Sequence, residues 1–323
     1  MKPQEPSRRS DEDPILNIDA TLRTLRRVAY APGRNAMSFN PIVALGSIAI
    51  AALIVVSAAS AFDRLAGSLV AGPELVTLAP GSFDHPQPGE FLGEGHPVAA
   101  PRILATVSVP LKIMKYQVSA SEYGQCVTAG SCKASDTLGS GNFPVTGVSH
   151  IDAGAYAAWL SVQTGATWRL PTDAEWAYAA GERFRSDIEG GAGDPNNPAL
   201  RWLAQYRTEA SLGRKSDPEP RVQGAFGVNS KGLADVAGNV WEWTSTCYIH
   251  ATVAADGTSI VSSIDNCGVH VVEGFHRTYM SNFIRDGKSG GCAVGTPPDN
   301  LGFRLVREHL NVVRATLRRL GFS

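Results

Sequence analysis

Residues 238–243 have the sequence Gly-Asn-Val-Trp-Glu-Trp, so two indoles flank one carboxylate directly after a turn. On a strand, Trp241 and Trp243 project to one face and Glu242 to the other, so the run can bury both indoles and present a carboxylate elsewhere. Carboxylates and turn carbonyls together suit a hard cation such as calcium. The oxygen ligands of this set come from Asp235, Gly238, Val240 and Glu242. From the spacing alone, a turn with two solvated acids is the alternative.

The composition excludes one class of partner. Of the 323 residues, 43% are hydrophobic and 18% are charged, which is typical of globular proteins with one large or two small domains. The net charge is -1, so the chain lacks the basic excess that nucleic-acid binding requires. We therefore expect no nucleic-acid partner.

The N-terminal part has the pattern of a membrane anchor. Residues 1–40 are polar, and we expect them to be disordered and cytoplasmic. Residues 41–62 contain no charged residue, and this segment is long enough for one transmembrane helix. The arginines lie before the segment. This bias predicts a single-pass protein of the bacterial inner membrane, with a linker at 63–74 and the main domain in the periplasm. Signal-peptidase cleavage after Ala59-Ser60-Ala61 is the alternative to an uncleaved anchor.

Three helices are predicted from capping boxes, in which a hydroxyl and an acid three residues later satisfy free helix amides. The pairs are Ser119 with Glu122, Ser149 with Asp152, and Thr172 with Glu175. In the second helix the spacing predicts a core stripe of Ile151, Ala155, Ala158 and Val162.

Strands are predicted on both sides of a long loop. Residues 76–83 form the first expected strand, and the Pro/Gly/His-rich segment 85–101 is the loop. Residues 103–109 and 111–118 follow as two further strands, separated by Pro110.

Four motifs occur in an order that resembles a known family. They are Pro-Val-x-x-Val-Ser at 144–149, Trp-Arg-Leu-Pro-Thr-x-Ala-Glu-Trp at 168–176, Gly-Leu-x-Asp at 232–235 with the run 238–243, and Asn-Leu-Gly-Phe-Arg at 300–304. This order is similar to the formylglycine-generating enzyme, or sulfatase-modifying factor, family. The resemblance implies an α+β domain at 75–307 with a C-type-lectin-like fold, low in regular secondary structure. It also implies that Asp235, Gly238, Val240 and Glu242 bind one structural calcium ion.

The family's chemistry is not expected here. Family members oxidise a target cysteine to formylglycine with copper held by two cysteines, shortly before the equivalent of Cys292. Counting back from Cys292 places Gly287 and Asn282 at those positions, and no cysteine lies between Cys267 and Cys292. Because two thiolates are what select Cu(I), we expect neither copper nor formylglycine generation.

The corresponding surface carries other polar residues. They are His276, Arg277, Tyr279, Asp286 and Cys292. These residues can form a polar pocket, and His276 with Cys292 can bind a different metal. The alternative is a structural pair of Arg277 with Asp286 and a surface His276, because the set lacks metal-ligand spacing.

Five cysteines outside the cytoplasm predict disulfides with one thiol remaining. Cys126 and Cys132 close a small loop and are the first expected pair. Cys247 and Cys267 are the second, which leaves Cys292 free; a Cys267–Cys292 bond is the rival pairing.

Two functions follow from these expectations. The first is a non-catalytic accessory protein that binds a partner protein or peptide in the family groove. Residues 201–206 and 276–279 are similar to NirV, a family member associated with copper nitrite reductase in denitrifying bacteria. The second is an oxidoreductase with a different metal centre, non-haem iron or copper, near His276 and Cys292.

The chain ends in an expected addition to the family domain. Residues 308–323 place Leu310, Val313, Leu317 and Leu320 on one helical face with arginines alongside. This pattern predicts a basic amphipathic helix that packs on the domain or lies on anionic lipid.

Overall fold

The computed structural model describes residues 72–186, 219–287 and 300–308. All of them belong to the second of two units into which the chain divides, residues 66–323. The expected segments 1–40 and 41–62, the end of the tail and Cys292 lie outside the described residues. Within the described part of the chain, no helix has the length and apolar character needed to cross a membrane.

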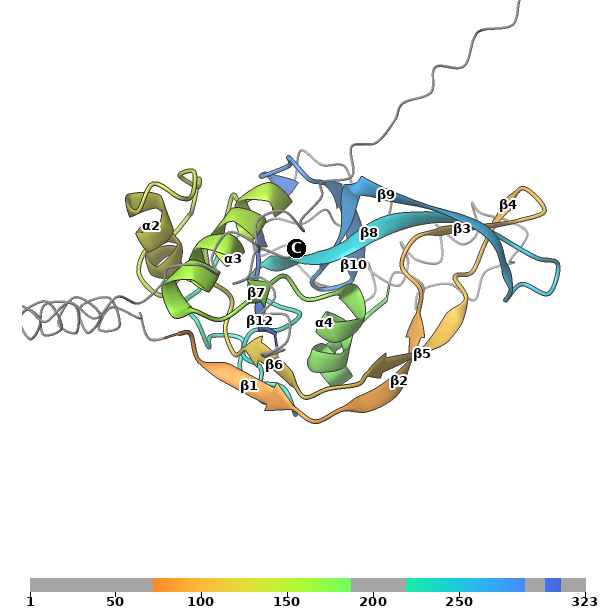
Figure 1. Ribbon diagram of the computed structural model, residues 1–323, viewed down its shortest axis with the longest axis horizontal. Coiled ribbons are helices and arrows are strands. Elements are labelled where there is room, and N and C mark those ends of the chain that lie inside the picture. The colour runs from red at the N-terminus through yellow and green to blue at the C-terminus, as the bar shows by residue number, and fades with distance from the viewer. Residues whose placement is uncertain (1–71, 187–218, 288–299, 309–323) are drawn as a thin grey trace, which may run out of the picture. The chain divides into compact units, whose positions relative to one another are not determined.

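The strands form three sheets, two antiparallel and one of mixed direction (Figure 1). One sheet has the order β1-β6-β12-β7, a second has the order β10-β9-β8-β3-β4 with β11 beside β8, and a third pairs β2 with β5. The strands are β1 Leu75–Leu78, β2 Gly81–Pro86, β3 Glu90–Gly93, β4 His96–Val98, β5 Arg102–Val107, β6 Leu111–Met114, β7 Trp168–Arg169, β8 Trp241–Val253, β9 Ile260–Glu273, β10 Arg277–Ser281, β11 Leu301–Gly302 and β12 Val306–Arg307.

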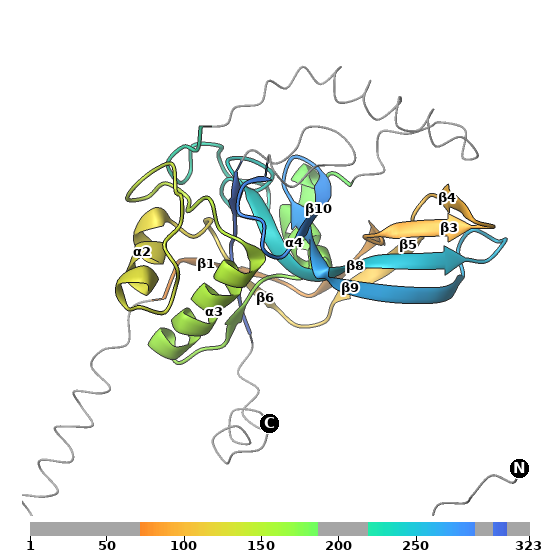
Figure 2. The ribbon, with the colours of Figure 1, turned by 90° about the horizontal axis from the view of Figure 1, so that it is seen from above.

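Strands β8 and β9 form a long antiparallel hairpin that organises the second sheet. β3 and β4 pair along its far half, away from the helices, as both ribbon views show (Figures 1 and 2). Two contacts on β8 are parallel, with β3 and with β11. The hairpin therefore receives chain segments from both ends of the domain, β3 on its far half and β11 on its near half.

Three α-helices begin at the predicted capping boxes. They are α2 Ala120–Thr128, α3 His150–Thr164 and α4 Asp173–Ala180, and the 3-10 helix η2, Gly181–Arg183, continues from α4. In each α-helix the hydroxyl accepts from the third amide and the acid accepts from the cap amide. The three helix starts are thus confirmed, and the architecture is α+β with few helices.

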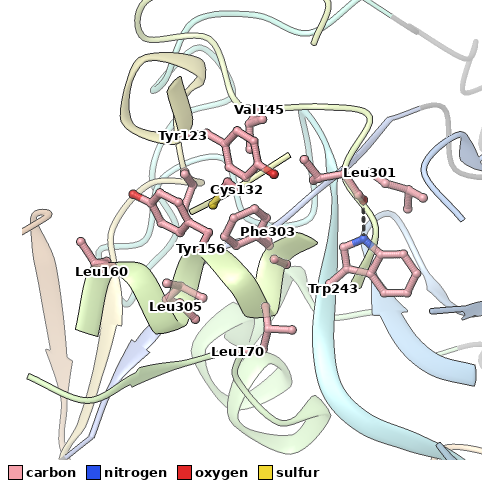
Figure 3. Packing of buried hydrophobic residues seen from close by; sticks show 14 of the residues in the cluster. Tyr123, Cys132, Val145, Tyr156, Leu160, Leu170, Trp243, Leu301, Phe303 and Leu305 are labelled. Atoms are coloured by element: carbon pink, nitrogen blue, oxygen red, sulfur yellow. Dashed lines mark hydrogen bonds between the residues drawn. The ribbon is translucent and has the colours of Figure 1, made fainter. Parts of the chain in front are cut away.

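The largest core cluster joins α2 and α3 to the C-terminal motif. Tyr123 and Tyr156 stack at 5.7 Å between ring centroids, and Phe303 meets both rings edge-on (Figure 3). Trp243 is fully buried and its indole donates to the carbonyl of Val148 at 2.8 Å. Burial of side chains of this size stabilises the fold by about 1.5–3 kcal/mol each, so the motif around Phe303 is fixed by packing.

Three expectations about elements are wrong. The strand expected at 76–83 is two strands in different sheets, because Pro80 cannot donate a ladder hydrogen bond and β1 and β2 pair with different partners. The loop expected at 85–101 contains β3 and β4, which are held by β8. The face of α3 is also different: Ile151 and Val162 are 59% and 77% exposed. Its buried face is instead Ala153, Tyr156, Ala157 and Leu160, because this face includes the large Tyr156 side chain.

Candidate metal site and the neighbouring groove

The loop before β8 has an unusual backbone. Asp235, Ala237 and Asn239 all have positive φ, at 57°, 57° and 65°. A left-handed conformation costs an alanine about 1–2 kcal/mol, and strain of this kind concentrates at functional sites. Its consequence here is geometric, because the carbonyls of Asp235, Gly238 and Val240 all reach the same point.

That point is the side-chain amide of Gln117, which lies between β6 and α2. Its Nε2 lies 3.2 Å from the oxygen of Asp235, 3.1 Å from that of Gly238 and 3.4 Å from that of Val240. It also donates to Glu242 Oε1 at 2.8 Å. Four oxygens therefore converge on one buried nitrogen.

Glu242 is held by donors from two other elements. Trp176 Nε1 on α4 donates to Oε2 at 2.9 Å, and Arg304 donates to both carboxylate oxygens at 2.6 and 2.8 Å. Glu242 and Arg304 are both completely buried. The charge of the carboxylate is therefore compensated by the guanidinium, and the carboxylate is fixed in position from three sides.

The sequence predicts two carboxylate ligands, Asp235 and Glu242, but the side chain of Asp235 has a different role in the structure. Its carboxylate accepts from the amides of Gly224 and Phe226 at 2.6 and 2.9 Å. Its carbonyl, not its side chain, faces the converging point. The carboxylate thus ties residues 224–226 to the loop, and Glu242 is the carboxylate at the centre.

The donor set fits a calcium ion. Oxygens that share calcium at 2.3–2.6 Å lie about 2.8–3.4 Å from one another. The Gln117 amide nitrogen lies 2.8–3.4 Å from the four oxygens. This is the distance expected between two neighbouring ligand atoms of one calcium ion. Among the described residues, no group of three or more His, Cys, Asp or Glu side chains could hold a metal. A site here depends mainly on carbonyls.

A second polar centre joins α4, β2 and the β9–β10 turn, and the sequence analysis did not anticipate it. Arg277 donates to Asp173 Oδ2 at 2.9 Å and to Glu273 Oε1 at 3.1 Å. His85 Nε2 lies 2.7 Å from Asp173 Oδ2. All four side chains are buried, and helix α4 contacts both β8 and β9 (Figure 2). We call Asp173, Glu273, Arg277 and His85 the buried charge cluster.

The pKa values of the two acids in this cluster shift in opposite directions. Burial and the adjacent Asp173 carboxyl raise the pKa of Glu273 well above its usual range. Burial acts the same way on Asp173, but the Arg277 guanidinium and the hydrogen bonds with Glu273 and His85 together outweigh it and lower the pKa of that carboxyl. Burial therefore favours the neutral form of the Glu273 carboxyl, and the Arg277 guanidinium favours the ionised form of Asp173.

The expected groove residues are only partly together. His276 packs edge-on against Trp241 at 4.7 Å, and its Nδ1 lies 2.8 Å from the carbonyl of Arg277. Tyr279 accepts from the amide of Gly89 at 2.8 Å. Arg277 points into the buried charge cluster, so it belongs to the core and not to an open pocket. Asp286 is described, and Cys292 lies outside the described residues.

Asn282, at one position expected for a copper cysteine, is held by the hairpin. Its Oδ1 lies 2.6 Å from His270 Nδ1, and its Nδ2 donates to the carbonyl of Cys267 at 2.8 Å. His270 stacks on His150 at 3.7 Å, and burial with the neighbouring His270 lowers the pKa of His150 to about 4. Asn282 thus aligns an imidazole pair.

Both expected disulfides are formed. Cys126 bonds to Cys132, and Cys247 bonds to Cys267. The second bond links β8 to β9, beside His270. The rival Cys267–Cys292 pairing is therefore wrong, because the sulfur of Cys267 is already used.

A pocket of about 260 Å³ opens beside the converging oxygens. Its lining includes Ala237, Gly238, Phe226 and Phe275. Arg183 also lines it and donates to the carbonyl of Phe226 at 3.3 Å. The loop that carries the converging carbonyls is therefore reached from this pocket.

The fold and the four converging oxygens define a class of protein. It is an α+β domain with little regular structure, built around a buried Trp-Glu-Trp strand. The comparison with family models names it. Residues 63–309 match the Sulfatase-modifying factor enzyme 1-like domain, and the chain belongs to this FGE-sulfatase family.

Similar proteins include active and inactive members. The chain is 34% identical to the formylglycine-generating enzyme of Mycobacterium tuberculosis over 149 residues, which are 44% of this chain and 46% of that protein. It is 30% identical to the inactive C-alpha-formylglycine-generating enzyme 2 of Mus musculus over 166 residues, 50% of this chain and 48% of that protein. The chain thus spans about half the length of the curated relatives it matches.

A solved structure is similar to the chain at lower identity. PvdO from Pseudomonas aeruginosa is 24% identical, with a TM-score of 0.46, and the match covers 73% of this chain and 95% of that one.

Proposed function

We propose that this protein is a non-catalytic accessory member of the family, which binds a partner protein or peptide through the surface beside Trp241. The observation that carries the proposal is the use of Asn282. Its amide is engaged by His270 and by the carbonyl of Cys267, and the count back from Cys292 places it where we expect a copper-binding cysteine in the family. An amide does not bind Cu(I) as a thiolate does, so the protein does not generate formylglycine.

The surface next to Trp241 supports peptide binding. Phe275 and His276 pack edge-on against its indole at 6.0 and 4.7 Å, and both are half-buried. Phe283, just beyond β10, is 71% exposed. Aromatic side chains with one buried and one open face are typical of binding surfaces. We propose that a partner segment packs on Phe275 and Phe283, beside the buried Trp241.

The proposal includes one structural calcium ion. Gly238, Val240 and Asp235 would supply carbonyl ligands and Glu242 a carboxylate oxygen. When bound, the ion would supply stability to the strained loop and no chemistry. The proposal also includes an anchor at 41–62, a periplasmic domain and a partner in the copper nitrite reductase system, as the NirV-like segments suggest.

Incubation of a sulfatase-type cysteine peptide with copper-loaded full-length protein tests the catalytic part. Mass spectrometry should find the peptide unchanged, with the Mycobacterium tuberculosis enzyme as the positive control. Loss of the thiol with gain of an aldehyde would contradict the proposal. Metal analysis of the purified protein tests the rival oxidoreductase, since stoichiometric iron or copper favours a centre near His276.

Affinity capture tests the binding part. The parent and a Phe275→Ala/Phe283→Ala variant are compared, with Val162→Ala as a control because Val162 is 77% exposed on α3. A partner retained by the parent and the control but lost by the double variant supports the surface. Alkaline phosphatase fused after Ser323 tests the orientation: an active fusion is expected, and an inactive one would reject it.

A further inference from the structure

The amide of Gln117 has one end with too many partners and one end with none. Its NH₂ group has two hydrogens, yet four oxygens lie within 3.4 Å of the nitrogen. Its Oε1 is buried without a hydrogen-bond partner. A buried polar atom without a partner costs about 1–3 kcal/mol. This cost leaves room for a state of the site in which the other orientation of the Gln117 amide is more stable.

Rotation of the amide by half a turn exchanges the two ends. Oε1 would then face the carbonyls of Asp235, Gly238 and Val240 and the carboxylate of Glu242. Five oxygens facing one another repel unless a cation lies between them, and hard cations take such sets of oxygens. The spacing of the Gln117 end from the four oxygens is that of neighbouring ligands in a calcium shell, as shown above.

We propose that Gln117 is a switching ligand. Without a cation its NH₂ bridges the four oxygens, and with calcium the amide rotates so that Oε1 becomes the fifth protein ligand. This inference rests on the calcium ion of the proposed function. Gln117 is therefore both the substitute for the ion and part of its shell, which explains how the strained loop stays folded in either state.

The charge of the site predicts its affinity. Among the residues that the structure describes, Glu242 is the only carboxylate that faces the point, and Arg304 donates to both of its oxygens. Affinity for calcium falls as ligand charge falls, and sites outside cells reach Kd values of about 10⁻⁴–10⁻³ M. We expect this weak range. The ion can enter from the pocket at Gly238.

Two substitutions separate the roles of Gln117. Gln117→Glu adds a carboxylate and should tighten calcium binding at least about tenfold, because ligand charge sets affinity. Gln117→Met keeps the length without a ligand oxygen, and should weaken binding at least about fivefold. Gln125→Glu is the matched control, because Gln125 is exposed on α2, and its affinity should equal that of the parent. Calcium is titrated by calorimetry on the full-length chain.

A measurement on the unchanged protein covers the case in which a variant fails to fold. In protein labelled with ¹⁵N in glutamine side chains, the NH₂ signal of Gln117 should shift on addition of calcium and saturate with the calorimetric Kd. The signal of Gln125 should stay in place. Calcium binding without a shift of the Gln117 signal would overturn the switching role and leave the ion. No calcium binding at about ten times the expected Kd would overturn the ion itself and this inference with it.

Discussion

Removal of the one cation in the buried charge cluster should be among the most destabilising substitutions in the domain. In Arg277→Met the side chain keeps similar bulk but loses its donors to Asp173, Glu273 and the carbonyl of Pro86. The Asp173 carboxylate then remains buried with no guanidinium beside it. Methionine cannot replace any of these hydrogen bonds.

The structure sets the size of the effect. Both partners of the Arg277–Asp173 pair are at most 2% exposed, and breaking a buried ion pair by removing one partner costs about 3–5 kcal/mol. The matched control is Arg102→Met, which breaks the pair of Arg102 with Asp84 at 2.5 Å, where the side chains are 53% and 63% exposed. An exposed pair contributes about 0–1 kcal/mol.

Urea unfolding of the full-length chain, followed by tryptophan fluorescence, measures both variants. The pH dependence adds a second check. The pKa of Asp173 is lowered in the fold, so its pairing stabilises the protein above the unfolded pKa of about 3.9 and is lost as the pH falls through the folded value. The gap between the parent and Arg277→Met should therefore shrink below about pH 4. Equal destabilisation by the two arginine substitutions at pH 7 would refute the reasoning.

Three further predictions concern other parts of the domain. The pKa of His150 is lowered to about 4, so the parent should lose up to about 3 kcal/mol of stability between about pH 6.5 and 4, and His150→Phe should not show this loss in urea unfolding; equal profiles would contradict it. At calcium tenfold above Kd, chelator should remove about 1.4 kcal/mol from the parent and nothing from Glu242→Gln, and an unchanged melting temperature of the parent would end the calcium claim. Deletion of residues 310–323 should lower the melting temperature if the tail packs on the domain and abolish vesicle binding if it lies on lipid, and a deletion that alters neither means that the tail is no amphipathic helix.

Features with local causes could be predicted from the sequence. A capping box is completed within four residues, so Ser119, Ser149 and Thr172 marked the helix starts correctly. The Cys126–Cys132 bond closes a short loop and needed no knowledge of the fold. Alternation along β8 predicted that Trp241 and Trp243 enter the core. In each case the decisive contacts lie close in the sequence.

Features assembled from distant segments could not be predicted from the sequence. Strand β3 exists because Glu90–Gly93 pairs with residues 250–253 of β8, and no local pattern in a Pro/Gly-rich stretch indicates this. The buried charge cluster combines residues near 85, 173 and 275, each of which is an ordinary surface residue by type. Gln117 carried no distinguishing signal, because polar residues such as Lys112, Lys115 and Ser119 occur throughout the same segment.

The position of β12 sets the order in which this domain can be completed. Val306–Arg307 lies between β6 and β7 inside the first sheet, and Arg304, just before it, supplies the counter-charge of Glu242. A growing chain can form its helices early, but the sheet keeps an empty central place until residue 307 arrives. Interior strands supplied last give high contact order and slow folding. The loop at 235–240 and Glu242 therefore acquire their final electrostatic setting only with the last strand of the domain, and partly made chains present neither a closed sheet nor a compensated Glu242.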